Sequence, residues 1–241
     1  MPRIVAGSAG GRVLKVPPGN TRPTSDRVRE ALFALLEARL GGPTGWGGQA
    51  VLDLYAGSGA LALEALSRGA ATAVAVDSAP AAVRVIRANA AALGLGAGLR
   101  AVNARAEVLA SRPAPDGAPF GLVFVDPPYD LPSASVSAVL AALARPARSA
   151  GGDPPGGPAE AGPGWLAHRA WVAVERSARS PALVWPAGWD NVGMRKYGDT
   201  TLFLARAWAG GQMDGIGHPA GRAAADGDTR RGPAQSEGGR P

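Results

Sequence analysis

A short apolar run that stops at two prolines constrains the fold of this chain more than any other feature. Residues 122–125 are aliphatic or aromatic without a break, which predicts a strand buried on both faces of a parallel sheet. The run ends at Asp126-Pro127-Pro128-Tyr129, and proline has no N–H for a ladder hydrogen bond. Open α/β sheets bind ligands at the carboxyl ends of their strands, so the sequence predicts a binding site at this motif.

The Asp-Pro-Pro-Tyr motif combines hydrogen-bond acceptors with an aromatic ring. Two successive prolines hold the backbone extended and leave the carbonyl groups of Asp126 and Pro127 without ladder partners. The amino group of a nucleobase needs such acceptors, and its ring needs a stacking surface such as Tyr129. The alternative interpretation is a plain strand-ending turn, because Asp and Pro are common turn formers.

Strands and helices alternate along the rest of the chain. The predicted strands cover residues 50–55, 72–77, 99–102, 120–126, 170–175, 189–195 and 200–207. The predicted helices cover residues 60–68, 79–93 and 133–143, with a short one near Glu107. This alternation is typical of an α/β fold with a doubly wound sheet, and the last two strands are expected to pair antiparallel.

A glycine turn after the first of these strands predicts a nucleotide-binding loop. Ala56-Gly57-Ser58-Gly59 joins that strand to a helix. Without Cβ atoms, Gly57 and Gly59 let a ligand approach the backbone, and the helix N-terminus faces it.

Two carboxylates accompany this loop. Asp53 lies four residues before Gly57, where it can reach the ammonium group of a cofactor that carries an amino acid, and Asp77 ends the next strand, where it can accept both hydroxyls of a ribose. The run from Gly57 to Ala62 also satisfies G-x-G-x-x-G/A, so a nicotinamide-dependent dehydrogenase is an alternative. A dehydrogenase has no evident use for two prolines after the fourth strand, and the ordered set of motifs is more specific than any one of them.

The N-terminal segment carries most of the net charge. Residues 1–29 contain six basic side chains and one acid, a net charge of +5 out of +6 for the whole chain. We expect a β-hairpin from residues 4–6 and 12–16, then a helix that Thr24 or Ser25 caps and that runs to about Leu40. Arginines near the start of that helix suit a phosphate backbone. The alternative is a solvated basic face, with codon bias favouring Arg over Lys.

Composition excludes several classes of protein. The chain has no Cys and two His, which rules out disulfides and thiolate metal sites and leaves little for zinc, so we expect no metal. No apolar run approaches the length of a membrane span, and the N-terminus lacks the apolar core of a signal peptide. We therefore expect a cytoplasmic protein.

Three regions follow from these patterns. Residues 1–45 are predicted to form a phosphate-binding extension, the hairpin and basic helix. Residues 46–209 are predicted to form the catalytic domain, interrupted by a flexible Pro- and Gly-rich insertion at about 145–164. Residues 210–241 have the composition of a disordered tail.

Two blocks of sequence resemble known enzymes. The run from Asp53 to Gly59 followed by Asp-Pro-Pro-Tyr resembles class I S-adenosylmethionine-dependent amino-methyltransferases of nucleic acid. The run Arg-Pro-Thr-Ser-Asp-Arg-Val-Arg-Glu-Ala-Leu-Phe, which ends at Phe33, and Leu-Glu-Ala-Leu-Ser-Arg-Gly, which ends at Gly69, are similar to the RsmD family. These are bacterial methyltransferases of guanine N2 in 16S ribosomal RNA. The similarity leaves out the insertion and the tail.

The resemblance implies a fold and a set of site residues. The fold would be Rossmann-like, a mostly parallel, doubly wound seven-stranded sheet with an antiparallel C-terminal hairpin. The methionine end, ribose and adenine of S-adenosylmethionine would be held by Asp53, Ala56, Gly57, Ser58, Gly59, Asp77, Ala104 and Arg105. The family usually has a small polar or acidic residue where this chain has Arg105, for which an exposed position at a helix start is the alternative. The catalytic residues would be Asp126, Pro127, Pro128 and Tyr129. The RNA-binding side chains would be Arg12, Arg22, Arg27, Arg29, Arg195 and Lys196.

The expected partner is 16S rRNA within a small-subunit particle. The protein is expected to be a monomer and not to bind a membrane. The same motif also serves adenine N6 and cytosine N4 methylation in DNA, so a DNA methyltransferase is an alternative. A non-catalytic RNA-binding or assembly protein is disfavoured because every motif acid is present.

Overall fold

The computed structural model describes residues 1–18, 26–145 and 164–207. The predicted insertion, apart from its two end residues, and the predicted tail lie outside the described residues, as does Arg22. All of the described residues belong to one structural unit. None of the described helices is long and apolar enough to cross a membrane.

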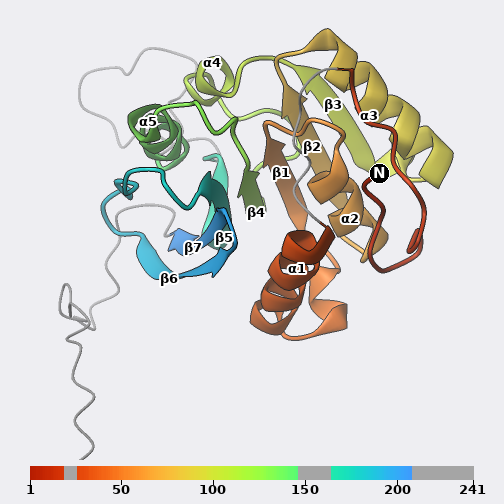
Figure 1. Ribbon diagram of the computed structural model, residues 1–241, viewed down its shortest axis with the longest axis horizontal. Coiled ribbons are helices and arrows are strands. Elements are labelled where there is room, and N and C mark those ends of the chain that lie inside the picture. The colour runs from red at the N-terminus through yellow and green to blue at the C-terminus, as the bar shows by residue number, and fades with distance from the viewer. Residues whose placement is uncertain (19–25, 146–163, 208–241) are drawn as a thin grey trace, which may run out of the picture. The chain divides into compact units, whose positions relative to one another are not determined.

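The described residues form a seven-stranded sheet in the order β3-β2-β1-β4-β5-β7-β6 (Figure 1). Its strands are β1 Ala50–Leu54, β2 Thr72–Asp77, β3 Leu99–Asn103, β4 Phe120–Val125, β5 Leu166–Ser177, β6 Asp190–Tyr197 and β7 Thr200–Ala207. The first five strands in that order are parallel, while β7 pairs antiparallel with both β5 and β6. The predicted mostly parallel sheet with an antiparallel C-terminal hairpin is confirmed.

Helices cover both faces of this sheet (Figure 1). They are α1 Asp26–Leu40, α2 Ala60–Ser67, α3 Pro80–Leu93, α4 Ala106–Ala110 and α5 Ser133–Leu143, with short 3-10 turns η1 Pro43–Trp46 and η2 Gly96–Gly98. Residues from α4 and α5 pack on one face, and residues from α1, α2 and α3 pack on the other.

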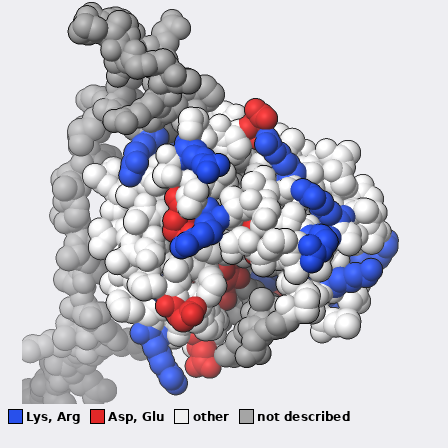
Figure 2. All heavy atoms as spheres, turned by 90° about the horizontal axis from the view of Figure 1, so that it is seen from above, with Lys and Arg blue, Asp and Glu red and all other residues white. Residues whose placement is uncertain are grey.

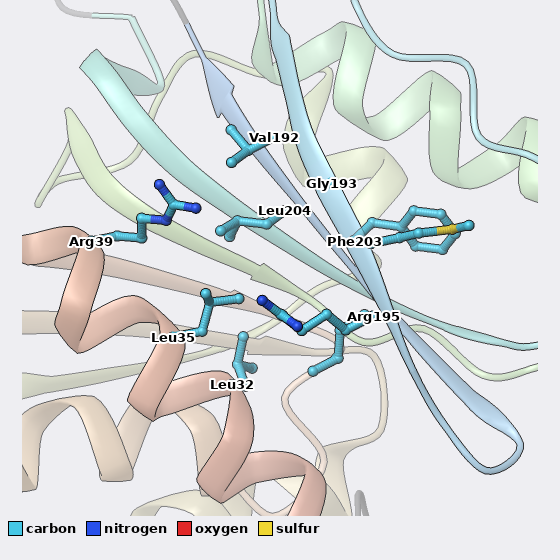
Figure 3. A pocket seen from close by; sticks show the side chains of 10 residues that line it. Leu32, Leu35, Arg39, Val192, Gly193, Arg195, Phe203 and Leu204 are labelled. Carbon is cyan, nitrogen blue, oxygen red and sulfur yellow. The ribbon is translucent and has the colours of Figure 1, made fainter. Parts of the chain in front are cut away.

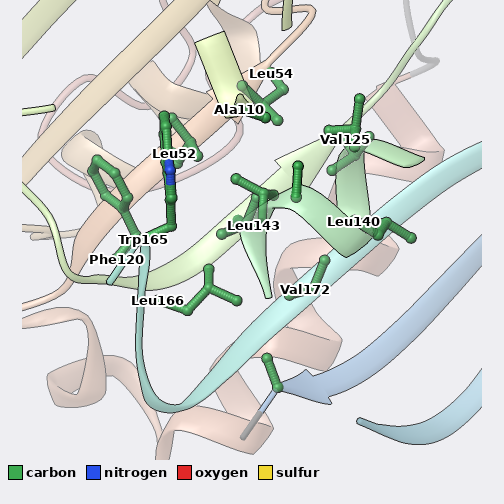
Figure 4. Packing of buried hydrophobic residues seen from close by; sticks show 14 of the residues in the cluster. Leu52, Leu54, Ala110, Phe120, Val125, Leu140, Leu143, Trp165, Leu166 and Val172 are labelled. Carbon is green, nitrogen blue, oxygen red and sulfur yellow. The ribbon is translucent and has the colours of Figure 1, made fainter. Parts of the chain in front are cut away.

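Strand β4 shows how the sequence produces this layering. Val123 and Val125 point into the cluster that includes α4 and α5, part of which Figure 4 shows, while Leu122 and Phe124 point into the cluster on the α1 side. Successive side chains of a strand point to opposite faces, so a continuous apolar run is buried on both. All four side chains are at most 1% exposed, and each such burial contributes about 1.5–3 kcal/mol to stability.

The predicted N-terminal hairpin forms in reduced length. The chain does turn back on itself, but within residues 1–18 the structure contains a single antiparallel bridge, between Arg3 and Val13. The backbone hydrogen bonds from Ile4 N to Arg12 O at 2.9 Å and from Leu14 N to Pro2 O at 2.8 Å flank this bridge. Beyond it, the buried carboxylate of Glu64 in α2 accepts hydrogen bonds from Val5 N at 2.6 Å and Ala6 N at 3.1 Å. The N-terminal loop is therefore docked on α2 through a side chain.

Gly7 offers a test of this docking. A Cβ atom on Gly7 would lie 1.9 Å from the carbonyl oxygen of Ser67, whereas one on Gly11 would meet nothing within 4 Å. Both glycines have a positive φ, so both alanine variants carry the same kind of backbone strain. We expect Gly7→Ala to lower the free energy of unfolding by about 2–4 kcal/mol and Gly11→Ala by about 1 kcal/mol. Equal losses in chemical denaturation would contradict the close packing.

Candidate active site

Four acids share one face of the sheet at its carboxyl edge. They are Asp53 in β1, Asp77 at the end of β2, Asp126 directly after β4 and Glu175 in β5. The residue before each of them packs into the cluster on the α4–α5 side. Alternation along a strand therefore directs all four acids to the α1–α3 side. The predicted acids are brought together, and Glu175 joins them although the sequence did not single it out.

These acids line a cavity of about 900 Å³. The predicted site residues that line it are Asp53, Ala56, Gly57, Ser58, Asp77, Ala104, Arg105, Asp126, Pro127, Pro128 and Tyr129, together with Arg29 from the predicted RNA-binding set. Gly59 does not line it. Instead Gly59 precedes α2 in the left-handed conformation, and a Cβ there would press on Ile86 at 3.2 Å. The absence of a side chain at Gly59 therefore allows α2 and α3 to pack closely.

Asp53 is buried and has one acceptor atom to spare. Its Oδ2 accepts a hydrogen bond from Ala62 N at 3.0 Å, while Oδ1 is buried without a hydrogen-bond partner. Burial, together with the negative charges of Asp126 and Asp77, raises the pKa of Asp53 to about 8. A cation that reached Oδ1 would supply both the missing hydrogen bond and the missing charge.

Asp77 organises the glycine loop. Its Oδ2 accepts a hydrogen bond from Gly57 N and its Oδ1 from Ala79 N, both at 2.8 Å. Gly57 has a φ of 55°, and the space beside it is open, since a Cβ there would meet nothing within 4 Å. Each carboxylate oxygen has further lone pairs that a pair of hydroxyls could use.

Arg105 is turned toward a neighbouring acid. Its side chain is 71% exposed, at the start of α4, and its Nε lies 3.5 Å from Glu107 Oε2. The other oxygen, Oε1, accepts a hydrogen bond from the Tyr55 hydroxyl at 3.0 Å. Burial and the Glu107 charge raise the pKa of Tyr55 well above its usual value, which keeps the hydroxyl protonated as a donor. Tyr55 and Glu107 also line the cavity, and the sequence had given neither a role.

The aromatic ring of the motif is held by two strands beyond it. The Tyr129 hydroxyl lies 2.9 Å from Thr200 Oγ1 in β7 and 3.4 Å from Glu175 Oε1 in β5. The loop after the motif is fixed to β5, because buried Arg176 donates a hydrogen bond from Nη2 to Leu131 O at 2.6 Å. Tyr129 as a whole is 38% exposed, and it lines the cavity. It is positioned yet accessible, as a stacking surface must be.

Two of the predicted RNA-binding arginines make contacts within the protein. Arg29 was expected on the exposed side of its helix, but it is 1% exposed and donates to Arg3 O and to Asp26 Oδ1. That expectation is wrong because Arg29 shares a helix face with apolar residues and ties α1 to the N-terminal loop. Arg12 donates to Ala92 O near the end of α3 at 2.8 Å. Arg27 is exposed.

The remaining predicted basic residues lie on the edge strand. Arg195 and Lys196 are exposed in β6, and Arg195 lines a groove of about 220 Å³ between α1 and the β6–β7 hairpin (Figure 3). The floor of this groove is apolar, with Leu32 and Leu35 from α1 facing Leu204 from β7. On the face seen in Figure 2, several basic side chains form a row along one side, and most of the acids lie toward the middle.

Comparison with known proteins places the chain in a family. The family model described as conserved hypothetical protein 95 matches residues 2–147, more than half of the chain. Ribosomal RNA small subunit methyltransferase D of Escherichia coli K12 is 35% identical over 215 residues, which cover 88% of this chain and 93% of that protein.

Solved structures give the same result. A methyltransferase structure from Escherichia coli is 33% identical with a TM-score of 0.66, covering 86% of this chain and 98% of that one. A Thermus thermophilus protein described as hypothetical is 31% identical with a TM-score of 0.63, covering 85% of this chain and 98% of that one. The chain belongs to the RsmD family of methyltransferases.

Proposed function

We propose that this protein transfers a methyl group from S-adenosylmethionine to the exocyclic N2 amine of a guanine in 16S rRNA of the small ribosomal subunit. One observation carries the proposal: two sets of acceptors line the same cavity. They are the buried carboxyl group of Asp53, whose Oδ1 has no hydrogen-bond partner, and the motif that starts at Asp126. The first suits a cationic amino acid and the second suits an amine. The family relationship supports the same chemistry.

The residues of the cavity fit S-adenosylmethionine. Asp53 Oδ1 would receive the ammonium group, Gly57 leaves open space for the methionine end, and the Asp77 carboxylate would accept ribose hydroxyls. Ala104 and Arg105 would flank the adenine. When bound, this cofactor supplies an electrophilic methyl group.

The motif would prepare the amine for attack. The lone pair of a guanine amine is delocalised into the ring, which makes it a poor nucleophile. Hydrogen bonds from its two N–H groups to the Asp126 carboxylate and the Pro127 carbonyl would orient that lone pair toward the methyl group, and the Tyr129 ring would stack on the base. Asp126 need not be a strong base, because the methylated amine becomes acidic and loses its proton afterwards.

Two alternatives differ in their products. A DNA adenine-N6 or cytosine-N4 methyltransferase would use the same acceptors, but the E. coli relative that matches 88% of this chain is named for ribosomal RNA. A nicotinamide-dependent dehydrogenase would use the glycine loop and Asp77. It would have no use for the unpartnered Oδ1 of Asp53 or for the two prolines that line the cavity.

Mapping of the product by mass spectrometry tests the proposal. Small subunits from a strain that lacks the protein would be incubated with the purified protein and labelled adenosylmethionine. The expected product is N2-methylguanine at one position of 16S rRNA. Label on DNA as methyladenine or methylcytosine, with none on RNA, would overturn the rRNA assignment. Nicotinamide binding that adenosylmethionine does not displace would favour the dehydrogenase.

Removal of the edge-strand charges tests the RNA contact. We expect the double variant Arg195→Ala/Lys196→Ala to weaken RNA binding and to reduce the slope of log affinity against log salt by about 1–2, since each lost phosphate contact removes about one released counterion. Arg84→Ala is the matched control, because Arg84 is exposed on α3, which packs at the opposite end of the sheet. An equal change in slope for the control would contradict a specific role for β6.

A further inference from the structure

Glu175 is a buried acid at the base end of the cavity that the proposed chemistry does not use. It is 6% exposed and lines the cavity. Val174 pairs with Val125 across β5 and β4, so Glu175 and Asp126 stand at the same level on adjacent strands and point to the same face. The carboxylate oxygens of Glu175 are hydrogen-bond acceptors that face the cavity beside the Asp-Pro-Pro-Tyr motif.

The position of Glu175 relates it to the base rather than to the cofactor. Asp53 and Asp77 lie on β1 and β2, on one side of β4, whereas β5 lies on the other side. The hydroxyl of Tyr129, the proposed stacking ring, lies 3.4 Å from Glu175 Oε1. A base stacked on that ring, with its amine at Asp126, would present the rest of its hydrogen-bonding edge toward β5.

The chemistry of that edge differs among the bases. Guanine has N1–H next to its N2 amine, so it shows only donors there. Adenine has the bare nitrogen N1 next to its N6 amine, and cytosine has the bare nitrogen N3 next to its N4 amine. A carboxylate is an acceptor only. It would bond to the donor of guanine and repel the lone pair of the other two bases.

We infer that Glu175 selects guanine by accepting the hydrogen bond of N1–H, while Asp126 and Pro127 accept those of the N2 amine. The inference rests on the proposed function, because it assumes that a base amine lies at Asp126. Base selection would thus rest on a side chain outside the four-residue motif.

A base analogue provides the test. 2-Aminopurine keeps the N2 amine but has a bare N1, and it would replace the mapped target guanine in a small-subunit particle reconstituted with synthetic RNA. Wild type is expected to prefer guanine by about tenfold to hundredfold in kcat/KM, the usual range for losing one specific polar contact to a base. Glu175→Gln places an amide donor near N1. The variant is expected to lose about tenfold or more on guanine and to shrink that preference by at least about tenfold.

Tyr129→Phe separates base selection from positioning of the ring. If Glu175 acts only through the Tyr129 hydroxyl, both Glu175→Gln and Tyr129→Phe would lower activity equally on guanine and on 2-aminopurine. An unchanged guanine preference in Glu175→Gln would therefore overturn the inference. Unchanged affinity for adenosylmethionine and an unchanged melting temperature would show that the variant is folded. Should Glu175→Gln fail to fold, Glu175→Asp, which withdraws the carboxylate by one methylene, is expected to reduce the preference instead.

The outcomes also separate this inference from the proposed function. Wild type that methylates guanine, with a preference that no Glu175 variant alters, would leave the function standing and remove Glu175 from base selection. Wild type that methylates adenine or cytosine but not guanine would overturn both.

Discussion

Asp126→Ala is expected to lower methyl transfer to RNA by at least about a thousandfold. The variant would lose the only charged acceptor of the motif, so the amine would no longer be oriented toward the methyl group. Affinity for adenosylmethionine is expected to persist, because Asp126 stands beside β4 while the vacant acceptor, Oδ1 of Asp53, lies in β1. Single-turnover rates with small subunits and calorimetric cofactor titration measure the two properties separately.

Asp126→Asn is the matched control for shape. The amide keeps one acceptor oxygen in place but loses the charge, so its rate is expected to fall between those of wild type and Asp126→Ala. Asp126 also helps to raise the pKa of Asp53. Both variants should therefore bind the cofactor at least as well as wild type at neutral pH, and loss of cofactor binding in either would assign Asp126 to the cofactor instead.

Asp53→Asn is expected to abolish cofactor binding and to change how stability depends on pH. The pKa of Asp53 is raised from 3.8 to about 8, so between these values the folded protein holds a proton that the unfolded chain releases. The stability that this proton contributes is complete below pH 3.8 and is lost as the pH rises through 8. The difference in unfolding free energy between the Asp53→Asn variant and wild type should therefore shift by about 6 kcal/mol across that interval.

Denaturation at several pH values, without cofactor, measures this shift. Because an ammonium group would favour the charged carboxylate, cofactor binding below pH 8 should release a proton from wild type. Calorimetry in buffers of different ionisation enthalpy detects that proton. Retention of cofactor affinity by Asp53→Asn, or a pH-independent difference in stability, would contradict the role given to this carboxyl.

The site residues that could be predicted from the sequence are those that stand in local strand-and-turn patterns. Asp53, Asp77 and Asp126 follow from strands that end in turns, since each lies where a parallel strand reaches the carboxyl edge. Glu175 lies inside a strand, and its place beside Asp126 comes from the pairing of β5 with β4. Glu107 likewise reaches the cavity from α4. The positions of these two residues depend on how distant parts of the chain pack and pair, which no local sequence pattern indicates.

The short hairpin and the buried Arg29, which both differ from prediction, have a shared cause. Glu64 sits within the otherwise apolar helix α2 and is fully buried, and it binds the loop that was expected to pair as strands. Arg29 is buried beneath the same loop and bonds to Arg3 O. An isolated charge in an apolar helix was the available signal, because a buried charge requires partners and backbone N–H groups are the nearest ones.

The outer strand of the sheet has a consequence for solubility. β6 is an edge strand, and an open edge offers its N–H and C=O groups to any other extended chain. Its register shifts between Asn191 and Gly193, and Arg195 and Lys196 follow that irregularity. A second copy pairing there would meet an uneven ladder and a like charge. The side chains proposed to contact RNA should thus also disfavour edge-to-edge pairing of two copies of the protein. The Arg195→Ala/Lys196→Ala variant should therefore be checked for aggregation.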